Sequence, residues 1–189
     1  MISENKISFG AKFINPINVR KLKEKSYNQA GISFVEINPL CADDVSALKY
    51  IAEHWEKDKY AINISNVANM IFKGKSSDKT RIYALTTQGD SFEKLNPDKI
   101  LGVVEAEEFL PFYIHINRFQ VKPEYINKGF GTAILNSLEE IYRKISLIAE
   151  NDEYVKKFYE RNGFYETSNG SNFYTWYKDY FADIFKIYR

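Results

Sequence analysis

Cysteine is nearly absent from this sequence, in which Cys41 stands alone. A single cysteine excludes an intrachain disulfide and is typical of proteins that work in a reducing compartment. As a catalytic nucleophile, Cys41 would need a histidine beside it as a base, and the neighbouring sequence offers none. We therefore interpret Cys41 as a small buried apolar residue.

Long apolar runs and an excess of charge are missing as well. The first residues lack the apolar stretch of a secretion signal, and nowhere do about 18 apolar residues follow one another. The 26 Lys and Arg residues balance 25 Asp and Glu residues, which gives no long-range attraction to nucleic acid or to an anionic membrane. We expect a cytoplasmic protein that binds neither partner.

Short extended segments open the chain, whose 189 residues suit one domain or a core domain with a short extension. We predict extended segments at residues 7–14 and 17–22, with a break at Asn15-Pro16. Residues 1–31 are therefore assigned to an N-terminal extension of short strands, and residues 32–189 to the main domain.

A helix is predicted from Ala42 onward, and a weaker one at residues 65–72. Two aspartates in the first turn of the earlier helix favour its start, because they face the positive end of the helix dipole. Its apolar side chains recur at helical spacing: Val45, Leu48, Ile51, Ala52 and Trp55.

Strand-like segments dominate the rest of the chain. Two helices interrupt them, one with apolar residues from Ile134 to Tyr142 and one that ends before Gly163. The strand–helix–strand unit over residues 112–150 implies a right-handed parallel crossover. We therefore predict a mixed α/β fold whose central sheet is mostly antiparallel. The expected strands cover residues 32–37, 80–87, 100–107, 112–121, 146–150, 164–167 and 172–177.

The most informative segment reads Val121-Lys-Pro-Glu-Tyr-Ile-Asn-Lys-Gly-Phe-Gly-Thr132. Here a strand ends, and two glycines stand at the mouth of a helix. Glycines let successive N–H groups point into one concavity, and the helix adds its own unpaired N–H groups and dipole. Together these features suit a diphosphate, with Lys128 as an added charge. A purely structural turn remains the alternative.

Two other phosphate-binding motifs can be tested on the same residues. A Walker loop requires a Gly-Lys-Ser/Thr triplet, which the sequence lacks. A dinucleotide-binding fingerprint requires a small residue where Ile134 stands, and the repeated strand–helix units of that fold are also lacking. A dinucleotide-dependent oxidoreductase is therefore a distant alternative.

Two separated motifs carry a resemblance to a known family. They are Val121-x-Pro-Glu-Tyr-x-x-Lys-Gly-x-Gly-Thr-x-x-Leu and, after Asn151, Phe158-Tyr159-x-x-x-Gly163-Phe164. The pair resembles the GNAT superfamily of acyl-CoA-dependent N-acetyltransferases, most sharply over residues 112–166. The resemblance implies a GNAT-type sheet flanked by helices, acetyl-CoA as the acyl donor and an amine as the acceptor.

The resemblance also implies which residues hold the coenzyme. In the family, the glycine-rich turn binds the diphosphate through backbone N–H groups, and the edge of the preceding strand pairs with the pantetheine arm. Ile126 departs from the family's Gln or Arg, which removes one side chain but leaves the backbone turn. Asn151 is either a helix N-cap or a ligand of the coenzyme arm. The implied coenzyme residues are Phe119, Gln120, Val121, Asn127, Lys128, Gly129, Phe130, Gly131, Thr132, Asn151 and Phe158.

Acetyl transfer to an amine needs a base for the ammonium and an acid for the departing thiolate. Backbone N–H groups at the Val121 strand edge are candidates for stabilising the charge that develops on the thioester oxygen. The resemblance suggests Tyr159 as the acid, although an aromatic core residue is the alternative. His115 is our candidate base, and strand alternation predicts that it points the same way as Phe119 and Val121. A structural histidine bonded across the sheet is the alternative for His115.

Glu105 and Glu107 share one face of the neighbouring strand and compete with His115 for the role of base. They are alternatively the residues that bind a cationic substrate. We assign no metal ligands. A non-catalytic module that binds coenzyme A, or only a partner protein, is the main alternative to an enzyme.

The chain ends in an aromatic tail at residues 179–189. Its side chains suit docking either on the same domain or on a second subunit, so a homodimer is one of two alternatives. The acceptor amine stays open, since small molecules, peptides and protein lysines all fit the sequence. The apolar tail residues at helical spacing are Phe181, Ile184, Phe185 and Tyr188.

Overall fold

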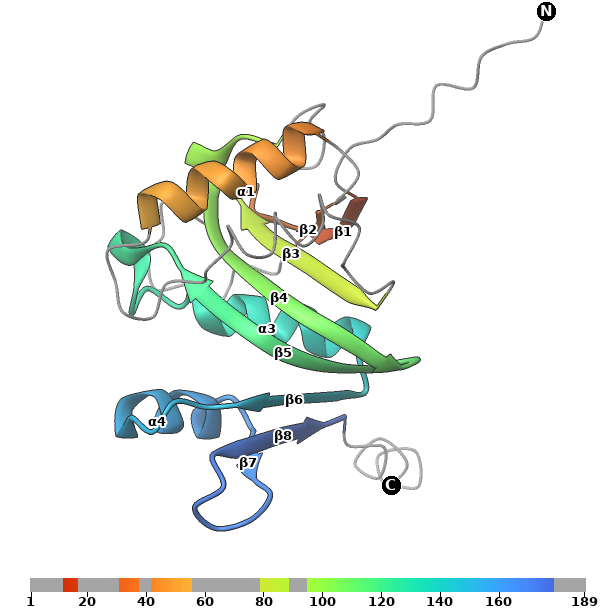
Figure 1. The fold of residues 1–189 in the computed structure, drawn as a ribbon, viewed down its shortest axis with the longest axis vertical. Coiled ribbons are helices and arrows are strands. Elements are labelled where there is room, and N and C mark those ends of the chain that lie inside the picture. The colour runs from red at the N-terminus through yellow and green to blue at the C-terminus, as the bar shows by residue number, and fades with distance from the viewer. Residues whose placement is uncertain (1–11, 17–30, 38–41, 56–78, 89–94, 179–189) are drawn as a thin grey trace, which may run out of the picture.

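The computed structural model of this chain describes residues 12–16, 31–37, 42–55, 79–88 and 95–178. These residues form one mixed sheet with helices on both of its faces, as Figure 1 shows. None of the helices in these ranges is long and apolar enough to cross a lipid bilayer.

The described strands form an eight-stranded sheet in the order β1-β2-β3-β4-β5-β6-β8-β7. Every neighbouring pair is antiparallel except β5 and β6, which run parallel because α3 connects them as a crossover. The predicted mixed α/β fold, with a mostly antiparallel sheet, is therefore confirmed. The strands are β1 (Lys12–Pro16), β2 (Ser33–Glu36), β3 (Thr80–Thr86), β4 (Ile100–Leu110), β5 (Tyr113–Val121), β6 (Lys144–Ile148), β7 (Tyr165–Glu166) and β8 (Phe173–Tyr177).

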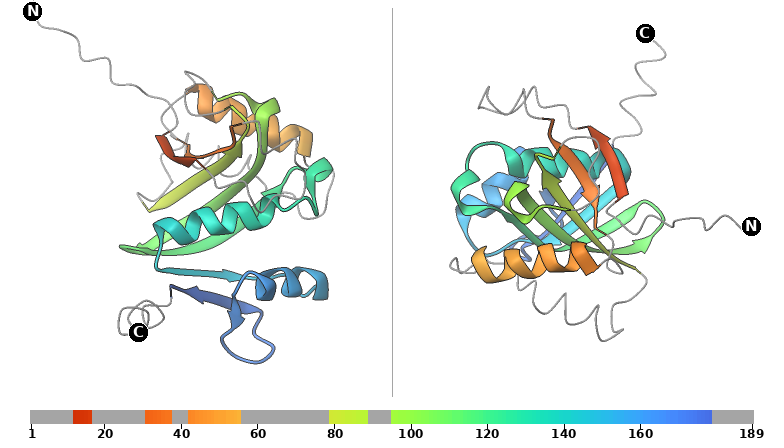
Figure 2. Two further views of the ribbon diagram at one scale, coloured as in Figure 1. Left: turned by 180° about the vertical axis from the view of Figure 1, so that it is seen from behind. Right: turned by 90° about the horizontal axis from the view of Figure 1, so that it is seen from above.

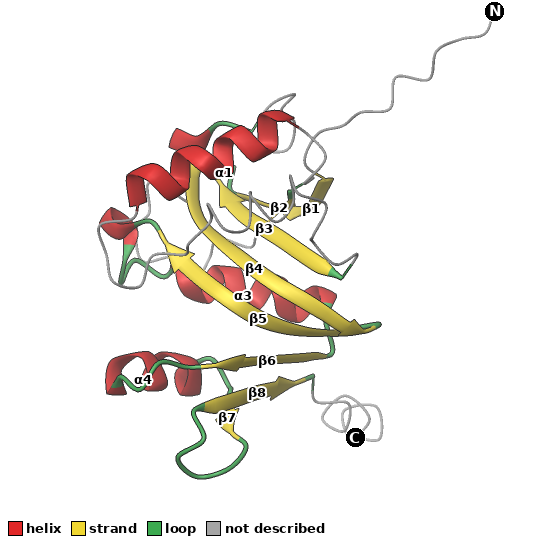
Figure 3. Cartoon of the chain, in the orientation of Figure 1, coloured by secondary structure: helices red, strands yellow, loops and turns green. Residues whose placement is uncertain are grey.

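Two helices cover opposite faces of the sheet, α1 (Ala42–Trp55) and α3 (Phe130–Ile141). Figure 2 shows α3 in front of the strands when the molecule is seen from behind, while α1 lies on the other side. A third helix, α4 (Glu153–Arg161), follows β6 and lies beside the ends of the strands, as the secondary-structure colouring of Figure 3 makes clear.

The predicted apolar stripe of α1 is buried against β3 and β4. Asp43 and Asp44 lie in its first turn, where the helix dipole favours negative charge. The stripe packs on Ile82, Ala84 and Val103. Its members Val45, Leu48, Ile51 and Trp55 are all buried, and the side chain of Ala52 lies outside the described residues.

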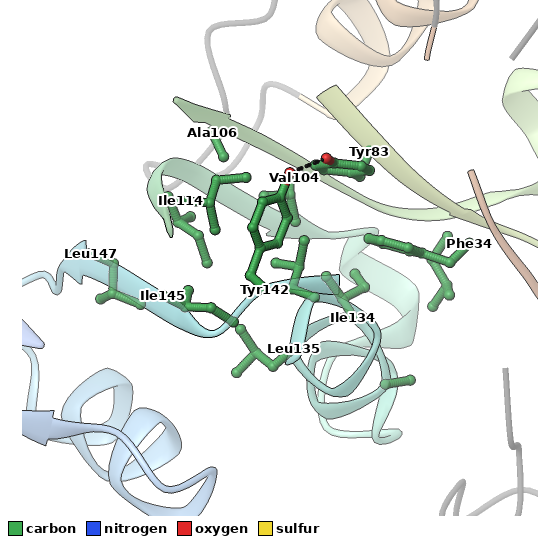
Figure 4. Packing of buried hydrophobic residues seen from close by; sticks show 14 of the residues in the cluster. Phe34, Tyr83, Val104, Ala106, Ile114, Ile134, Leu135, Tyr142, Ile145 and Leu147 are labelled. Carbon is green, nitrogen blue, oxygen red and sulfur yellow. Dashed lines mark hydrogen bonds between the residues drawn. The ribbon is translucent and has the colours of Figure 1, made fainter. Parts of the chain in front are cut away.

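The larger core lies between α3 and the middle of the sheet, as Figure 4 shows. Ile134, Leu135 and Leu138 of the predicted α3 stripe are buried there. At the end of α3, the Tyr142 hydroxyl lies 2.6 Å from the Tyr83 hydroxyl of β3, a hydrogen bond drawn in Figure 4. This bond gives each of two buried hydroxyls a partner and joins the end of α3 to β3.

The structure corrects the expected break at the start of the chain. Residues Asn15 and Pro16 belong to β1 instead of ending it. The sheet tolerates this proline because β1 is an edge strand of the described sheet. An edge strand has a neighbouring strand on one side only, so a proline there can lack an N–H donor without loss of an inter-strand hydrogen bond. The segment at 17–22, the helix at 65–72 and the tail at 179–189 lie outside the described residues.

Candidate active site

The parallel strands β5 and β6 separate partway along their length. Their pairing runs from Tyr113 with Lys144 to Ile116 with Leu147, and β5 then continues to Val121 while it pairs with β4 on its other side. Figure 1 shows the two strands spreading toward these ends. A cavity of about 650 Å³ opens there. Because a strand points alternate backbone groups to its two sides, β5 presents N–H and C=O groups to this cavity.

The glycine-rich turn forms one end of the cavity. Asn127 and Gly129 adopt left-handed backbone conformations, with φ of 65° and 93°, and α3 begins directly afterwards. Gly131 lies so close to α4 that a Cβ at this position would meet Cζ of Phe158 at 3.0 Å. The first N–H groups of a helix have no intrahelical acceptor, so this end of the cavity suits an anion.

Cationic side chains surround the turn. The Nζ atoms of Lys122 and Lys128 lie 5.7 and 5.3 Å from the ring centroid of Tyr125. Arg118 and Arg161 line the cavity itself. Two of these cations have a carboxylate partner. Lys122 is paired with Glu124 at 2.8 Å, and Arg118 is paired with Glu105 at 3.5 Å. Lys128 adds its positive charge to the backbone donors of the turn. Backbone donors beside a cation suit a diphosphate.

The opposite wall of the cavity is α4, whose N-cap is Asp152. Its side chain accepts hydrogen bonds from the backbone N–H groups of Tyr154 at 2.8 Å and Val155 at 3.2 Å. The alternative of Asn151 as the N-cap is therefore wrong, because the extended residue before the helix is Asp152. The Asn151 side chain instead accepts a hydrogen bond of 2.8 Å from Lys156 and lies outside the lining of the cavity.

Two aromatic side chains of α4 line the cavity. The Phe158 ring stacks on Phe119 of β5, with ring centroids 6.0 Å apart, and so joins the two walls. Tyr159 is 7% exposed, and burial, with the carboxylate of Glu150 as a smaller cause, raises the pKa of its hydroxyl above the ordinary value. Tyr159 therefore carries its proton at neutral pH.

A β-bulge changes the side to which His115 points. Arg118 lies opposite Glu105 and Ile116 lies opposite Ala106, so Asn117 is the extra residue on β5. A bulge shifts the alternation of side chains by one residue. The prediction that His115 shares a side with Phe119 is therefore wrong: Phe119 packs on the core beneath α3, whereas His115 lies opposite Glu107 on the α1 face.

His115 is held in place by its neighbours on β6 and β8. Its Nδ1 atom lies 2.8 Å from Oγ of Ser146, to which the Tyr113 hydroxyl also approaches at 3.0 Å. The Phe173 ring stacks on the imidazole with centroids 5.9 Å apart. Burial lowers the pKa of His115 below its ordinary value, and Glu107 partly opposes this shift. The imidazole is therefore neutral at neutral pH, as a general base must be.

Glu105 occupies the same face, next to the cavity. Its Oε2 atom lies 3.5 Å from Nη1 of Arg118, and its side chain is 14% exposed. Burial raises the pKa of this carboxyl, and Arg118 opposes the shift. Of these groups on the α1 face, Arg118 lines the cavity, whereas Glu105 and His115 lie beyond its lining.

The structure brings most of the predicted coenzyme residues together. The side chain of Phe130 is instead buried in the core, which leaves only its backbone for a ligand, and Lys128 lies over the Tyr125 ring. Predicted residues that line the cavity are Phe119, Gln120, Val121, Asn127, Gly129, Gly131, Thr132, Phe158 and Tyr159.

Several residues that line the cavity were not predicted as site residues, among them the polar side chains of Arg118, Tyr154 and Arg161. Tyr154 precedes Phe158 by one helical turn, so the spacing alone could have placed both on one side of α4. Arg118 carried no such signal, because its direction depends on the bulge at Asn117.

Comparison with known proteins gives a consistent result. Residues 82–166 match the family model of the acetyltransferase (GNAT) domain. A search of curated proteins finds no match.

Solved structures share the fold at low sequence identity. An acetyltransferase from Streptococcus agalactiae 2603 superposes with a TM-score of 0.53 at 14% identity, covering 79% of this chain and 99% of its own. A spermidine N-acetyltransferase chimera from Vibrio cholerae SpeG and hSSAT has a TM-score of 0.53 at 16% identity, with 77% and 95% covered. The ribosomal-protein-S18-alanine N-acetyltransferase of Escherichia coli has a TM-score of 0.50 at 16% identity, with 76% and 89% covered.

Proposed function

We propose that this chain, an acyltransferase that carries a GNAT acetyltransferase domain, transfers the acetyl group of acetyl-CoA directly to a primary amine within a ternary complex. One observation carries this proposal. The cavity between the diverging strands β5 and β6 leads to a left-handed, glycine-containing turn at the start of α3.

The residues around this cavity fit coenzyme A. The backbone edge of residues 119–121 is proposed to hold the pantetheine arm, and residues 127–132 to hold the diphosphate through their N–H groups. Support comes from Gly131, whose lack of a side chain lets the Phe158 ring of the cavity lining pack against the start of α3 beside the turn. When bound, acetyl-CoA supplies the acetyl group as a reactive thioester.

Tyr159 is proposed to donate a proton to the departing thiolate. Its place in the cavity lining, on the same helix as Phe158, supports this role. The raised pKa keeps the hydroxyl protonated but makes it a weaker acid, so the support comes from position and not from acidity. General acids of this kind contribute about 10²–10⁴-fold to the rate.

His115 is proposed to remove the proton from the acceptor amine. The lowered pKa of the imidazole keeps it unprotonated, and the contact from Nδ1 to Ser146 fixes the ring. Glu105 is the second candidate, since the raised pKa of its carboxyl makes it a stronger base than an ordinary glutamate. Both lie on the α1 face, from which we propose that the acceptor approaches.

The acceptor is proposed to be a small-molecule, peptide or protein amine. We also place the protein in the cytoplasm, because its single cysteine suits a reducing compartment.

The test is calorimetry of the purified chain with acetyl-CoA and, in parallel, with NADH. Acetyl-CoA is expected to bind and NADH is not. At a concentration of about 100 times its dissociation constant, acetyl-CoA should stabilise the fold by about 2.7 kcal/mol. A screen of amines, followed by mass spectrometry, is then expected to show a gain of one acetyl group. Absence of acetyl-CoA binding would contradict the proposal.

A further inference from the structure

Asn127 has an unusual backbone in the middle of the turn. Its φ of 65° is left-handed, a conformation that residues with a side chain adopt rarely, although asparagine tolerates it better than most. Its side-chain oxygen accepts a hydrogen bond from the hydroxyl of Tyr154 on α4. A residue far along the chain therefore contacts the turn at a residue with a left-handed backbone.

The Tyr154 hydroxyl is presented by a well-anchored helix. The backbone N–H of Tyr154 donates to the Asp152 cap at 2.8 Å. One turn later, Phe158 stacks on Phe119 and closes over Gly131. The N-cap and the packing of Phe158 therefore hold the first turn of α4, from which the Tyr154 side chain extends.

The contact joins the two walls of the cavity. Asn127 lies on the wall formed by the turn, Tyr154 lies on the wall formed by α4, and both line the cavity. Tyr154 is 60% exposed, so burial of its ring gives little reason for its placement. The hydrogen bond to Asn127 is the specific interaction that the hydroxyl makes.

We infer that Tyr154 is a positioning residue whose hydroxyl straps the diphosphate-binding turn to α4. This inference rests on the proposed function, because the turn is the part of the site that holds the coenzyme diphosphate. The strap holds Asn127 in its left-handed conformation and so directs the N–H groups of the turn toward the ligand. Preorganisation of this kind improves affinity by removing an ordering cost from binding.

Tyr154→Phe tests the strap, because it removes the hydroxyl and keeps the ring in the cavity. A net hydrogen bond of this kind predicts a rise of about 3- to 10-fold in the dissociation constant of CoA, measured by calorimetry. Tyr165→Phe is the matched control, since Tyr165 is also exposed and lies outside the cavity lining; its affinity for CoA should equal that of the wild type.

A shorter ligand locates the effect within the site. Pantetheine lacks the diphosphate, so its affinity should be the same for the wild type and for Tyr154→Phe. Equal weakening of CoA and pantetheine would overturn the inference, because the hydroxyl would then act on the arm and not through the turn.

A double mutant separates the strap from direct contact with the ligand. Asn127→Gly keeps the freedom to adopt a positive φ and removes the acceptor. If the two residues act together, adding Asn127→Gly to Tyr154→Phe should weaken CoA binding little further. Additive losses would mean that each side chain contacts the ligand independently, and would overturn the strap.

Hydrogen exchange of the ligand-free protein gives a readout independent of binding. Amides of residues 127–132 should exchange faster in Tyr154→Phe than in the wild type, and those of β3 should not change. If the wild type fails to bind CoA, the proposed function fails. If the wild type binds CoA and Tyr154→Phe matches it in affinity and exchange, only the strap fails.

Discussion

Gly131 lies directly against the ring of Phe158, and a Cβ on Gly131 would meet Cζ at 3.0 Å and Cε2 at 3.3 Å. The same ring stacks on Phe119, so the start of α3, the end of β5 and α4 meet at one point. The close approach of α3 to α4 sets the width of the cavity at the turn. A side chain at position 131 therefore requires the Phe158 ring to move by a few tenths of an ångström.

Gly131→Ala is expected to weaken CoA binding by about tenfold, which corresponds to about 1.4 kcal/mol. The methyl group forces the Phe158 ring to shift, and the lining of the cavity shifts with it. Calorimetry with CoA measures the effect. Gly170→Ala serves as the control, because it strains a positive φ of 77° with open space around it. It should lower the free energy of unfolding and leave CoA affinity unchanged; equal affinity losses in both variants would contradict the prediction.

Tyr159→Phe should lower kcat by about 100-fold, as loss of a general acid predicts, with little change in the affinity for acetyl-CoA. Because the pKa of Tyr159 is raised by burial, the wild type should also show no loss of activity from its ionisation up to about pH 10. Steady-state kinetics on the amine found by the screen, over a range of pH, measure both effects. An unchanged kcat would leave Tyr159 as a core residue only.

His115→Ala should remove the acidic limb of the pH–rate profile. A base acts when it is unprotonated, and burial lowers the pKa of His115. Wild-type kcat/KM should therefore be full at pH 7 and fall at pH values below the ordinary histidine pKa of about 6.5. In the variant, kcat/KM should be low at every pH. Glu105→Gln is the comparison. If Glu105→Gln loses the acidic limb of the pH–rate profile and His115→Ala retains it, the base is Glu105.

His115 should also couple stability to pH. Its pKa is lower in the folded protein than in the unfolded chain, so the unfolded chain binds a proton first as the pH falls. The contribution of His115 to stability is therefore present above about pH 6.5 and declines as the pH falls toward its folded pKa. Urea unfolding of the wild type and of His115→Gln at pH 7.5 and 5.5 measures this. The wild type should lose more stability between the two values than the variant does.

Tyr83→Phe should destabilise the fold by about 1–3 kcal/mol, because it leaves the buried hydroxyl of Tyr142 without the partner it has at 2.6 Å. The double variant Tyr83→Phe/Tyr142→Phe should lose little more than the single one, since both hydroxyls are then removed together. Denaturant unfolding gives the free energies. Losses that simply add would show that the two hydroxyls contribute separately.

Local sequence accounted for the elements that build the site. The apolar spacing of α3 gave a buried stripe of Ile134, Leu135 and Leu138, and the two glycines at 129 and 131 marked the turn at its start. These features depend on residues within one or two turns of each other, where helical periodicity and glycine conformation act directly. The parallel crossover followed from the order of strand, helix and strand, and the structure confirmed it.

Tertiary structure decided which side chains face one another. The bulge at Asn117 places His115 on the α1 face, opposite to the face of Phe119. Strand alternation read from one segment cannot predict this bulge, because the bulge depends on the register of β5 with β4. The contact between Tyr154 and Asn127, and that between Phe158 and Gly131, join residues far apart in the chain. The sequence by itself thus determined the turn, its helix and the fold class, since those rest on local geometry. The width of the cavity and the direction of its polar groups depend on long-range packing, and only the folded chain set them.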